Sequence, residues 1–207
     1  ISEYKSYWEW KPWANTVAYY PLKADFNDYS WNWYNLTVSN ASITNLNWVP
    51  CASYTDGRAY NATPAVWSTR TLVAWFINQT SWAWVLVWTW ATANWYQSIM
   101  LASDWATKVQ ISDYYSTWYS SWTLTSTRHL WVAVASWANM YLYVDWTLVA
   151  SWTHSSTGSS TWVSAWAKPY IDSYTNYFTG YLSNVIIENK ARTAQEVADY
   201  YNSTKSK

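Results

Sequence analysis

Short apolar runs recur along the chain from Val17 onward, about every ten residues, with polar and turn-forming residues between them. Examples are "RTLVAWFI" at 70–77, "HLWVAVAS" at 129–136 and "YLSNVIIE" at 181–188, which are rich in β-branched and aromatic residues. Runs of this length and composition are typical of strands in antiparallel sandwiches and barrels. The pattern therefore predicts an all-β fold, a two-sheet antiparallel jelly-roll sandwich.

One segment near the C-terminus has helical periodicity instead. In "RTAQEVADYYNS" at 192–203, Thr193 can cap a helix, and Glu196 stands three residues later, where a capping box requires it. Val197, Tyr200 and Tyr201 then fall on one face. The sequence predicts one short C-terminal helix that begins near Thr193.

The first residues differ from the rest of the chain. Residues 1–16 lack strand periodicity and contain Pro12, so we interpret them as a linker or N-terminal extension. Residues 17–207 have a length that suits one domain with a sizeable core. The sequence begins with Ile1 and shows no signal-like segment, so we expect this domain to be part of a larger protein or assembly.

The charge composition argues against two classes of binding partner. The chain has 12 basic and 12 acidic residues, without a run of lysine or arginine. Binding to nucleic acid or to an anionic membrane therefore has no electrostatic support. No apolar stretch reaches 18 residues, so we expect no membrane insertion. Cys51 is the single cysteine, which excludes an internal disulfide and leaves the redox compartment open.

Tryptophan is unusually abundant and glycine unusually rare. The chain has 22 tryptophans and 3 glycines, whereas average usage would give roughly 14 glycines. Ten tryptophans follow Ser, Asn or Asp, in the second position of dipeptides that normally end in glycine at turns. Asp145–Trp146, between "YLYV" and "TLVASW", is one of them. An indole at such a position meets a steric penalty that glycine avoids.

Two tryptophans follow a different pattern, because Trp75 and Trp131 continue apolar strand runs and are predicted to be buried. For the other twenty, three explanations compete: an aromatic surface that stacks on sugars or peptides, a deliberate test of the fold, or UGA codons translated as tryptophan. Some uncultivated bacteria and their phages read UGA as glycine. We favour this alternative code, because a stacking surface would not also remove turn glycines.

The codon hypothesis predicts backbone geometry. Tryptophans that stand in glycine positions should have positive φ, or distorted turns, and their rings should project from the molecule. We expect this of Trp146 and of most of a further set, which comprises Trp31, Trp33, Trp82, Trp105, Trp137 and Trp152.

With glycine at the suspect positions, four segments resemble a laminin-G-like (LamG) domain of the concanavalin A-like lectin/glucanase superfamily. They are "VAYYPLKADFNDYSWNWYNLTV" at 17–38, "TLVAWFI" at 71–77, "RHLWVAVASWANMYLYVDWTLVASW" at 128–152 and "FTGYLSNVIIENKARTAQEVADYY" at 178–201. The resemblance implies a two-sheet jelly roll. It also implies, most often, a binding module on a secreted or surface protein, although a fold alone does not settle function.

The acidic residues argue against an enzyme. Glycoside hydrolysis needs two carboxyl groups about 5 to 10 Å apart. Glucanases of the superfamily carry them at alternating positions of one strand, which point into one cleft. The glutamates of this chain are Glu3, Glu9, Glu188 and Glu196, and no predicted strand has two acidic residues two or four positions apart. We therefore expect no catalytic residues.

A structural calcium ion is the cofactor that the oxygen-bearing side chains favour. The segment "DFNDYSWNW" at 25–33 offers a compact set of them, which are Asp25, Asn27, Asp28 and Asn32. The resemblance to the LamG domain implies calcium near this turn. The alternative is that these residues form Asx turns with their own backbone. The sequence leaves both possibilities open.

Two polar and aromatic segments are candidates for ligand binding, because tyrosine offers a flat ring and a hydroxyl to a sugar. The candidates are Tyr114, Tyr115 and Tyr119 in "SDYYSTWY", and Tyr174, Asn176 and Tyr177 in "DSYTNY". We expect a non-catalytic carbohydrate-binding or adhesive domain of an extracellular, cell-surface or virion protein, with a glycan or a surface protein as partner. The alternative is a structural domain that contacts other proteins and binds no glycan.

Overall fold

A computed structural model describes residues 14–61, 69–78, 87–90, 99–104, 108–112, 119–123, 127–136, 139–153, 162–165 and 178–205. These residues form strands and one helix, which are β1 (Thr16–Tyr20), β2 (Thr37–Leu46), β3 (Val49–Asn61), β4 (Arg70–Asn78), β5 (Val87–Trp90), β6 (Ile99–Asp104), β7 (Lys108–Ser112), β8 (Tyr119–Thr123), β9 (His129–Ser136), β10 (Asn139–Val144), β11 (Thr147–Thr153), β12 (Trp162–Ala165), β13 (Phe178–Glu188) and α1 (Ala194–Thr204). The predicted all-β fold with one short C-terminal helix is confirmed.

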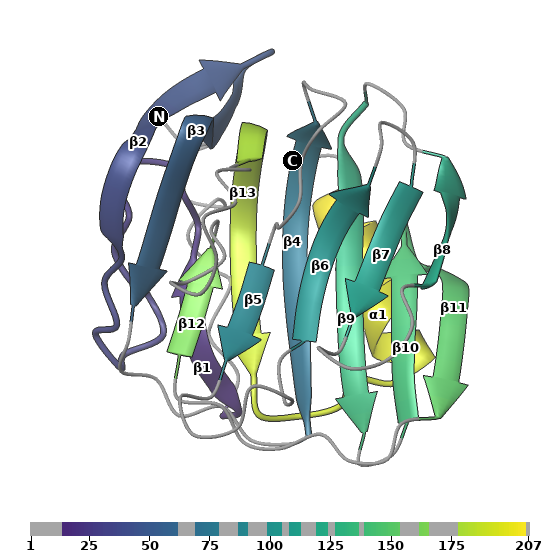
Figure 1. The fold of residues 1–207 in the computed structure, drawn as a ribbon. Coiled ribbons are helices and arrows are strands. Elements are labelled where there is room, and N and C mark those ends of the chain that lie inside the picture. Colours follow the sequence, from purple (N-terminus) through teal and green to yellow (C-terminus); the bar gives the residue numbers. More distant parts are fainter. Residues whose placement is uncertain are drawn as a thin grey trace.

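The strands lie in two layers (Figure 1). The helix-bearing layer comprises β1, β13, β4, β9, β10 and β11, and the second layer comprises β12, β5, β6, β7 and β8. All strand pairs are antiparallel. The layers are joined, because β3 pairs with β13 at Ala52–Tyr54 and with β12 at Ala59–Asn61. A sandwich of two layers is therefore built from one continuous hydrogen-bonded path of strands.

The change of layer along β3 depends on a glycine. At Gly57 an added Cβ would lie 2.1 Å from the carbonyl oxygen of Asn40, which is closer than any side chain can come. Asn40 itself has a φ of 53° and sits where the pairing of β2 with β3 changes register. Asp56–Gly57 has the composition of a turn pair, but the structure places it inside β3 at this bulge.

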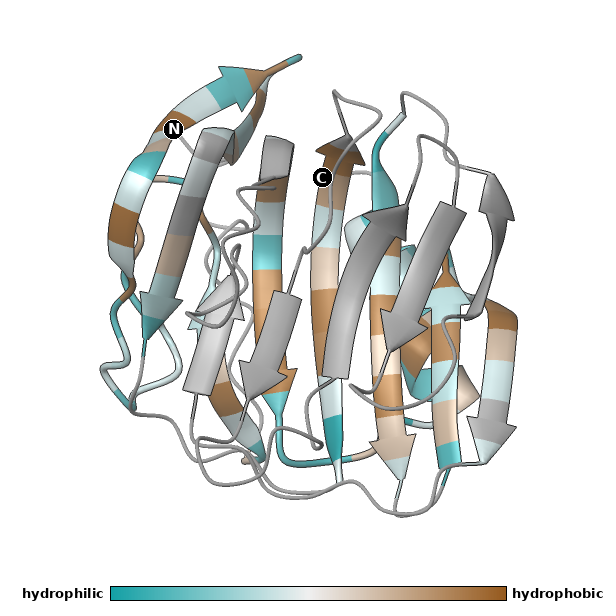
Figure 2. Cartoon of the chain, in the orientation of Figure 1, coloured by the Kyte–Doolittle hydropathy of each residue, from teal (hydrophilic) through white to brown (hydrophobic). Residues whose placement is uncertain are grey.

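The main core lies between the two layers. Alternate residues of β4 point inward, so Leu72, Ala74 and Phe76 belong to this core, which also contains residues of β9, β10 and β13. Figure 2 shows the resulting alternation of hydrophobic and hydrophilic residues along these strands. Trp131 is fully buried here, with its ring centroid 4.0 Å from that of Phe76. The predicted burial of Trp131 is confirmed.

A second, smaller core lies on the outer face of the helix-bearing layer, under α1 (Figure 1). Val73 and Trp75 of β4 point outward, where Val197 and Tyr200 of the helix pack over this face. Trp75 is buried as predicted. The capping box is also confirmed, because the Thr193 hydroxyl accepts from the Glu196 backbone N–H and the Glu196 carboxylate accepts from that of Thr193.

The two ends of the chain bear on the remaining predictions. Residues 1–13 lie outside the described part of the structure, and β1 begins at Thr16, so the extension proposed for residues 1–16 stays a prediction. Within the described residues, no helix has the length and apolar character that a membrane span needs; α1 has 11 residues.

Candidate functional site

The predicted ligand-binding residues fall largely beyond the structural description. Tyr114 and Tyr115 of the first segment lie outside the described residues, as do Tyr174, Asn176 and Tyr177 of the second. Tyr119 is the first residue of β8, and its side chain is likewise not described. Their role in binding therefore stays a prediction.

The Asp25–Asn32 loop is described in full, and Asp28 is its centre. Its Oδ1 accepts hydrogen bonds from the backbone N–H groups of Tyr19, at 2.9 Å, and Ser30, at 2.8 Å. Its Oδ2 accepts from the backbone N–H of Tyr34, at 3.0 Å, and from the Ser30 hydroxyl, at 2.8 Å. The Asp28 carboxylate is buried, and it ties the loop to β1.

The other members of the proposed calcium set are also engaged. Asp25 accepts from the backbone and side-chain N–H groups of Asn27 and from the Tyr29 hydroxyl. The Asn32 amide donates to the carbonyl oxygens of Thr16 and Val17. These contacts match the Asx-turn alternative, since a calcium ion would have to replace protein donors at both carboxylates.

No group of three or more His, Cys, Asp or Glu residues that could hold a metal ion occurs in the described ranges. As they lie, the four loop residues do not offer a free set of oxygen ligands. Calcium at this loop stays a prediction, which the effect of a chelator on the melting temperature tests.

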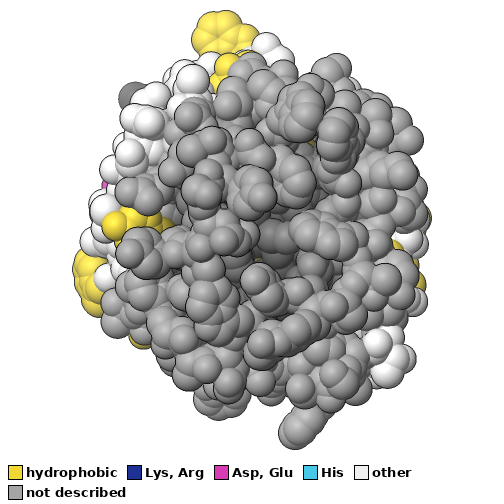
Figure 3. Space-filling view, in the orientation of Figure 1, with side chains coloured by type: hydrophobic (Ala, Val, Ile, Leu, Met, Phe, Trp, Pro, Cys, Tyr) yellow, Lys and Arg dark blue, Asp and Glu magenta, His cyan; other side chains and the backbone are white. Residues whose placement is uncertain are grey.

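Four tryptophans of the described residues have left-handed backbone. The φ values are 77° for Trp31, 59° for Trp33, 69° for Trp48 and 71° for Trp146. All four side chains are exposed, from 54% for Trp146 to 98% for Trp48. Hydrophobic side chains accordingly protrude at the tip of the β2–β3 hairpin (Figure 3). The geometry predicted for Trp31, Trp33 and Trp146 is confirmed.

The remaining tryptophans of that prediction behave differently or are not described. Trp152 lies within β11, where it pairs with Met140 of β10, so the prediction of a left-handed turn residue was wrong there. The reason is that β11 continues through Ser151–Trp152 to Thr153. Trp82, Trp105 and Trp137 lie outside the described residues.

Both described two-residue hairpins have positive φ at both turn positions. In the β2–β3 hairpin, Leu46 pairs with Val49 around Asn47, which has a φ of 51°, and Trp48. In the β10–β11 hairpin, the strands close around Asp145, which has a φ of 48°, and Trp146. This is the type I′ geometry, in which Asn-Gly and Asp-Gly are the preferred sequences.

Asp145 also fastens its hairpin to β9. Its Oδ2 lies 2.6 Å from Nδ1 of the buried His129, and its Oδ1 accepts from the Leu130 backbone N–H at 2.8 Å. The Thr127 hydroxyl lies 3.1 Å from Nε2 of the same imidazole. The main-chain bond of Asp145 to Leu130 reinforces this contact, so we interpret the group as a structural clamp. The sequence places His129 next to an apolar strand but does not show its partner.

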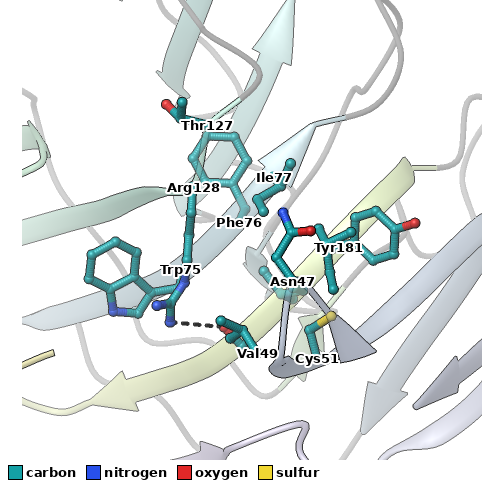
Figure 4. A pocket seen from close by; sticks show the side chains of 12 residues that line it. Asn47, Val49, Cys51, Trp75, Phe76, Ile77, Thr127, Arg128 and Tyr181 are labelled. Atoms are coloured by element: carbon teal, nitrogen blue, oxygen red, sulfur yellow. Dashed lines mark hydrogen bonds between the residues drawn. The ribbon is translucent and has the colours of Figure 1, made fainter. Parts of the chain in front are cut away.

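A cavity of about 290 Å³, called the outer pocket below, opens on the outer face of the helix-bearing layer. The strands β3, β13 and β4 run side by side beneath it, and the segment before β9 and the β2–β3 turn complete its wall. Figure 4 shows how the side chains from these elements surround it. Its lining residues are Leu46, Asn47, Val49, Cys51, Trp75, Phe76, Ile77, Thr127, Arg128, Tyr181, Leu182 and Ser183.

Among the described residues that line the outer pocket, Arg128 is the charged one. Its guanidinium carbon lies 4.3 Å from the centroid of the Trp75 ring, which is a cation–π contact. Its Nη2 donates to the Ser183 hydroxyl at 3.4 Å (Figure 4). Burial lowers the pKa of the Arg128 guanidinium, yet an arginine stays protonated at neutral pH. The pocket therefore contains a fixed positive charge against an aromatic wall.

Cys51, at the floor of the outer pocket, stays a protonated thiol and is therefore not suited to act as a nucleophile. It is buried, and this burial raises its pKa above the ordinary value for cysteine. A raised pKa keeps the side chain in the protonated form, whereas cysteine nucleophiles react as thiolates. The pocket is thus suited to binding rather than to covalent chemistry at this residue.

Sequence reasoning missed the outer pocket. Arg128 and Ser183 are 55 positions apart, and Trp75 and its hydrogen-bond partner Thr204 are 129 apart. The one available signal was Arg128 itself, a cation directly before an apolar strand run. No local pattern showed that it would meet Trp75.

No family model matches the chain, and no curated protein matches it. Solved structures do match. Domain 4 of an extracellular GH43 arabinanase from Geobacillus stearothermophilus, in complex with arabinotriose, is similar with a TM-score of 0.72 and 15% identity, over 89% of this chain and 97% of that one. The binding domain of Paraclostridial Mosquitocidal Protein 1 is similar with a TM-score of 0.67 and 14% identity, over 91% and 52%.

A sialidase from Trypanosoma rangeli, in complex with sialic acid, is similar with a TM-score of 0.73 and 12% identity, over 94% of this chain and 34% of that one. The chain thus spans about a third of the sialidase and about half of the mosquitocidal binding domain, but nearly the whole arabinanase domain. At these identities the likeness shows a shared β-sandwich fold. It does not assign this chain to the LamG family.

Proposed function

We propose that this chain is a non-catalytic carbohydrate-binding domain of an extracellular or surface protein. The likeness to the arabinanase domain carries this proposal, because it extends over nearly the whole of both chains and that structure holds arabinotriose. A structure of botulinum neurotoxin type C is also similar, with a TM-score of 0.64 and 11% identity. Cell entry of that toxin depends on interaction with two ganglioside molecules. Both of these similar structures thus belong to proteins that interact with a glycan.

The described carboxylates support a domain without catalysis. Each acidic side chain that the structure describes has a structural partner: Glu188 with Arg192, Glu196 with Thr193, Asp25 with Asn27, Asp28 with Ser30, Asp145 with His129 and Asp199 with Gln195. Glycoside hydrolysis requires a pair of carboxyl groups free to act on the substrate. A binding function makes no such demand.

We assign sugar binding to the tyrosine-rich segments at 112–119 and 172–177. In this proposal Tyr114, Tyr115, Tyr119, Tyr174 and Tyr177 stack on sugar rings, and the amide of Asn176 bonds a hydroxyl. A glycan array that includes arabinotriose and ganglioside glycans should show binding.

Alanine variants of these residues provide the matched test. Tyr114→Ala and Tyr174→Ala should each weaken the array signal at least tenfold, whereas Tyr29→Ala, which removes a half-exposed tyrosine elsewhere, should not change it. Concentration-dependent self-association in light scattering, without any glycan signal, would instead support a structural domain that contacts proteins.

We also propose that about twenty of the tryptophans stand where the gene specifies glycine. In this proposal the chain is a LamG-like domain of a cell-surface or virion protein, and its source is an uncultivated bacterium or a phage. The positive φ of Trp31, Trp33, Trp48 and Trp146 supports this idea, because that conformation favours glycine. The coding DNA and the intact mass of protein from its native source test it directly. A native mass that matches 22 tryptophans would refute it.

A further inference from the structure

We draw no further inference here: the strongest candidate, the outer pocket over β3, β4 and β13, carries none, because Arg128 already has partners within the protein and the buried Trp75 ring is covered by Arg128 and Tyr201, so nothing in the structure identifies a ligand.

Discussion

Trp146 occupies a position that an L-residue enters at a cost. Its φ of 71° places it in the left-handed region, and 54% of its surface stays exposed, so little packing offsets the strain. The penalty for left-handed backbone is about 1–2 kcal/mol for a residue with a Cβ. Trp31, Trp33 and Trp48 are in the same situation.

Trp146→Gly should therefore increase the free energy of unfolding by about 1 kcal/mol, because glycine adopts positive φ without the Cβ penalty. Urea unfolding of the two proteins measures this. Trp131→Gly is the matched control: the same substitution in the core should cost at least about 3 kcal/mol, since it leaves a large cavity. A loss of stability in Trp146→Gly would contradict the interpretation of this residue.

Asp28 is the residue that decides between calcium and an Asx turn. Its carboxylate accepts from three backbone N–H groups and one hydroxyl, so Asp28→Asn places an amide N–H against donors. We expect a loss of about 2 kcal/mol or more in the free energy of unfolding. If the hydrogen bonds alone hold the loop, a chelator leaves the melting temperature of the wild-type protein unchanged. A lower melting temperature with chelator would establish a bound ion.

At the level of elements, the junction between β13 and α1 depends on a buried ion pair. Arg192 Nε donates to Glu188 Oε2 at 2.6 Å and its Nη2 donates to Oε1 at 3.0 Å, with both side chains fully buried. The Arg192 backbone N–H also donates to the Thr71 hydroxyl of β4. These contacts fix the direction in which the chain leaves the sheet and enters the helix.

Glu188→Gln should lower the free energy of unfolding by about 3–5 kcal/mol, because it removes the carboxylate that pairs with the buried Arg192 guanidinium. The double variant Glu188→Leu/Arg192→Met removes both charges and should recover most of that loss. Urea unfolding of both variants gives the comparison. A double variant no more stable than Glu188→Gln would show that the pair does more than balance its own charges.

At the scale of the molecule, the strain at the tryptophans with left-handed backbone reduces the stability of the whole domain. Several strained turns of about 1 kcal/mol each would consume a large part of the roughly 5–15 kcal/mol by which a domain is stable. A version with glycine at all twenty suspect positions, and with Trp75 and Trp131 kept, should have a higher soluble yield and a higher melting temperature. Equal stability of the two versions would end the codon hypothesis.

Much of the architecture followed from local pattern. The runs that contain Trp75 and Trp131 predicted strands because β-branched and aromatic residues fit a pleated, buried surface. Thr193 and Glu196 predicted the helix start, since a capping box is made by residues three positions apart. Turn dipeptides predicted the left-handed geometry of Trp31, Trp33 and Trp146. In each case the cause lies within a few residues.

The pattern was misleading where a strand continued through a turn dipeptide. Ser151–Trp152 remains in β11 because this segment pairs with β10. Pairing with a neighbouring strand overrode the local preference there.

By itself, then, the sequence determined the strand-rich class, the capped C-terminal helix, the buried Trp75 and Trp131 and the glycine-like turns, because short-range sterics and periodicity decide these features. Only the tertiary structure decided that β3 joins both layers, that Glu188 and Arg192 are buried together, and that Arg128 meets Trp75 and Ser183 in one pocket. Those contacts depend on strand order and on the placement of α1. Strand order is set by the packing of the whole chain, which no local pattern encodes.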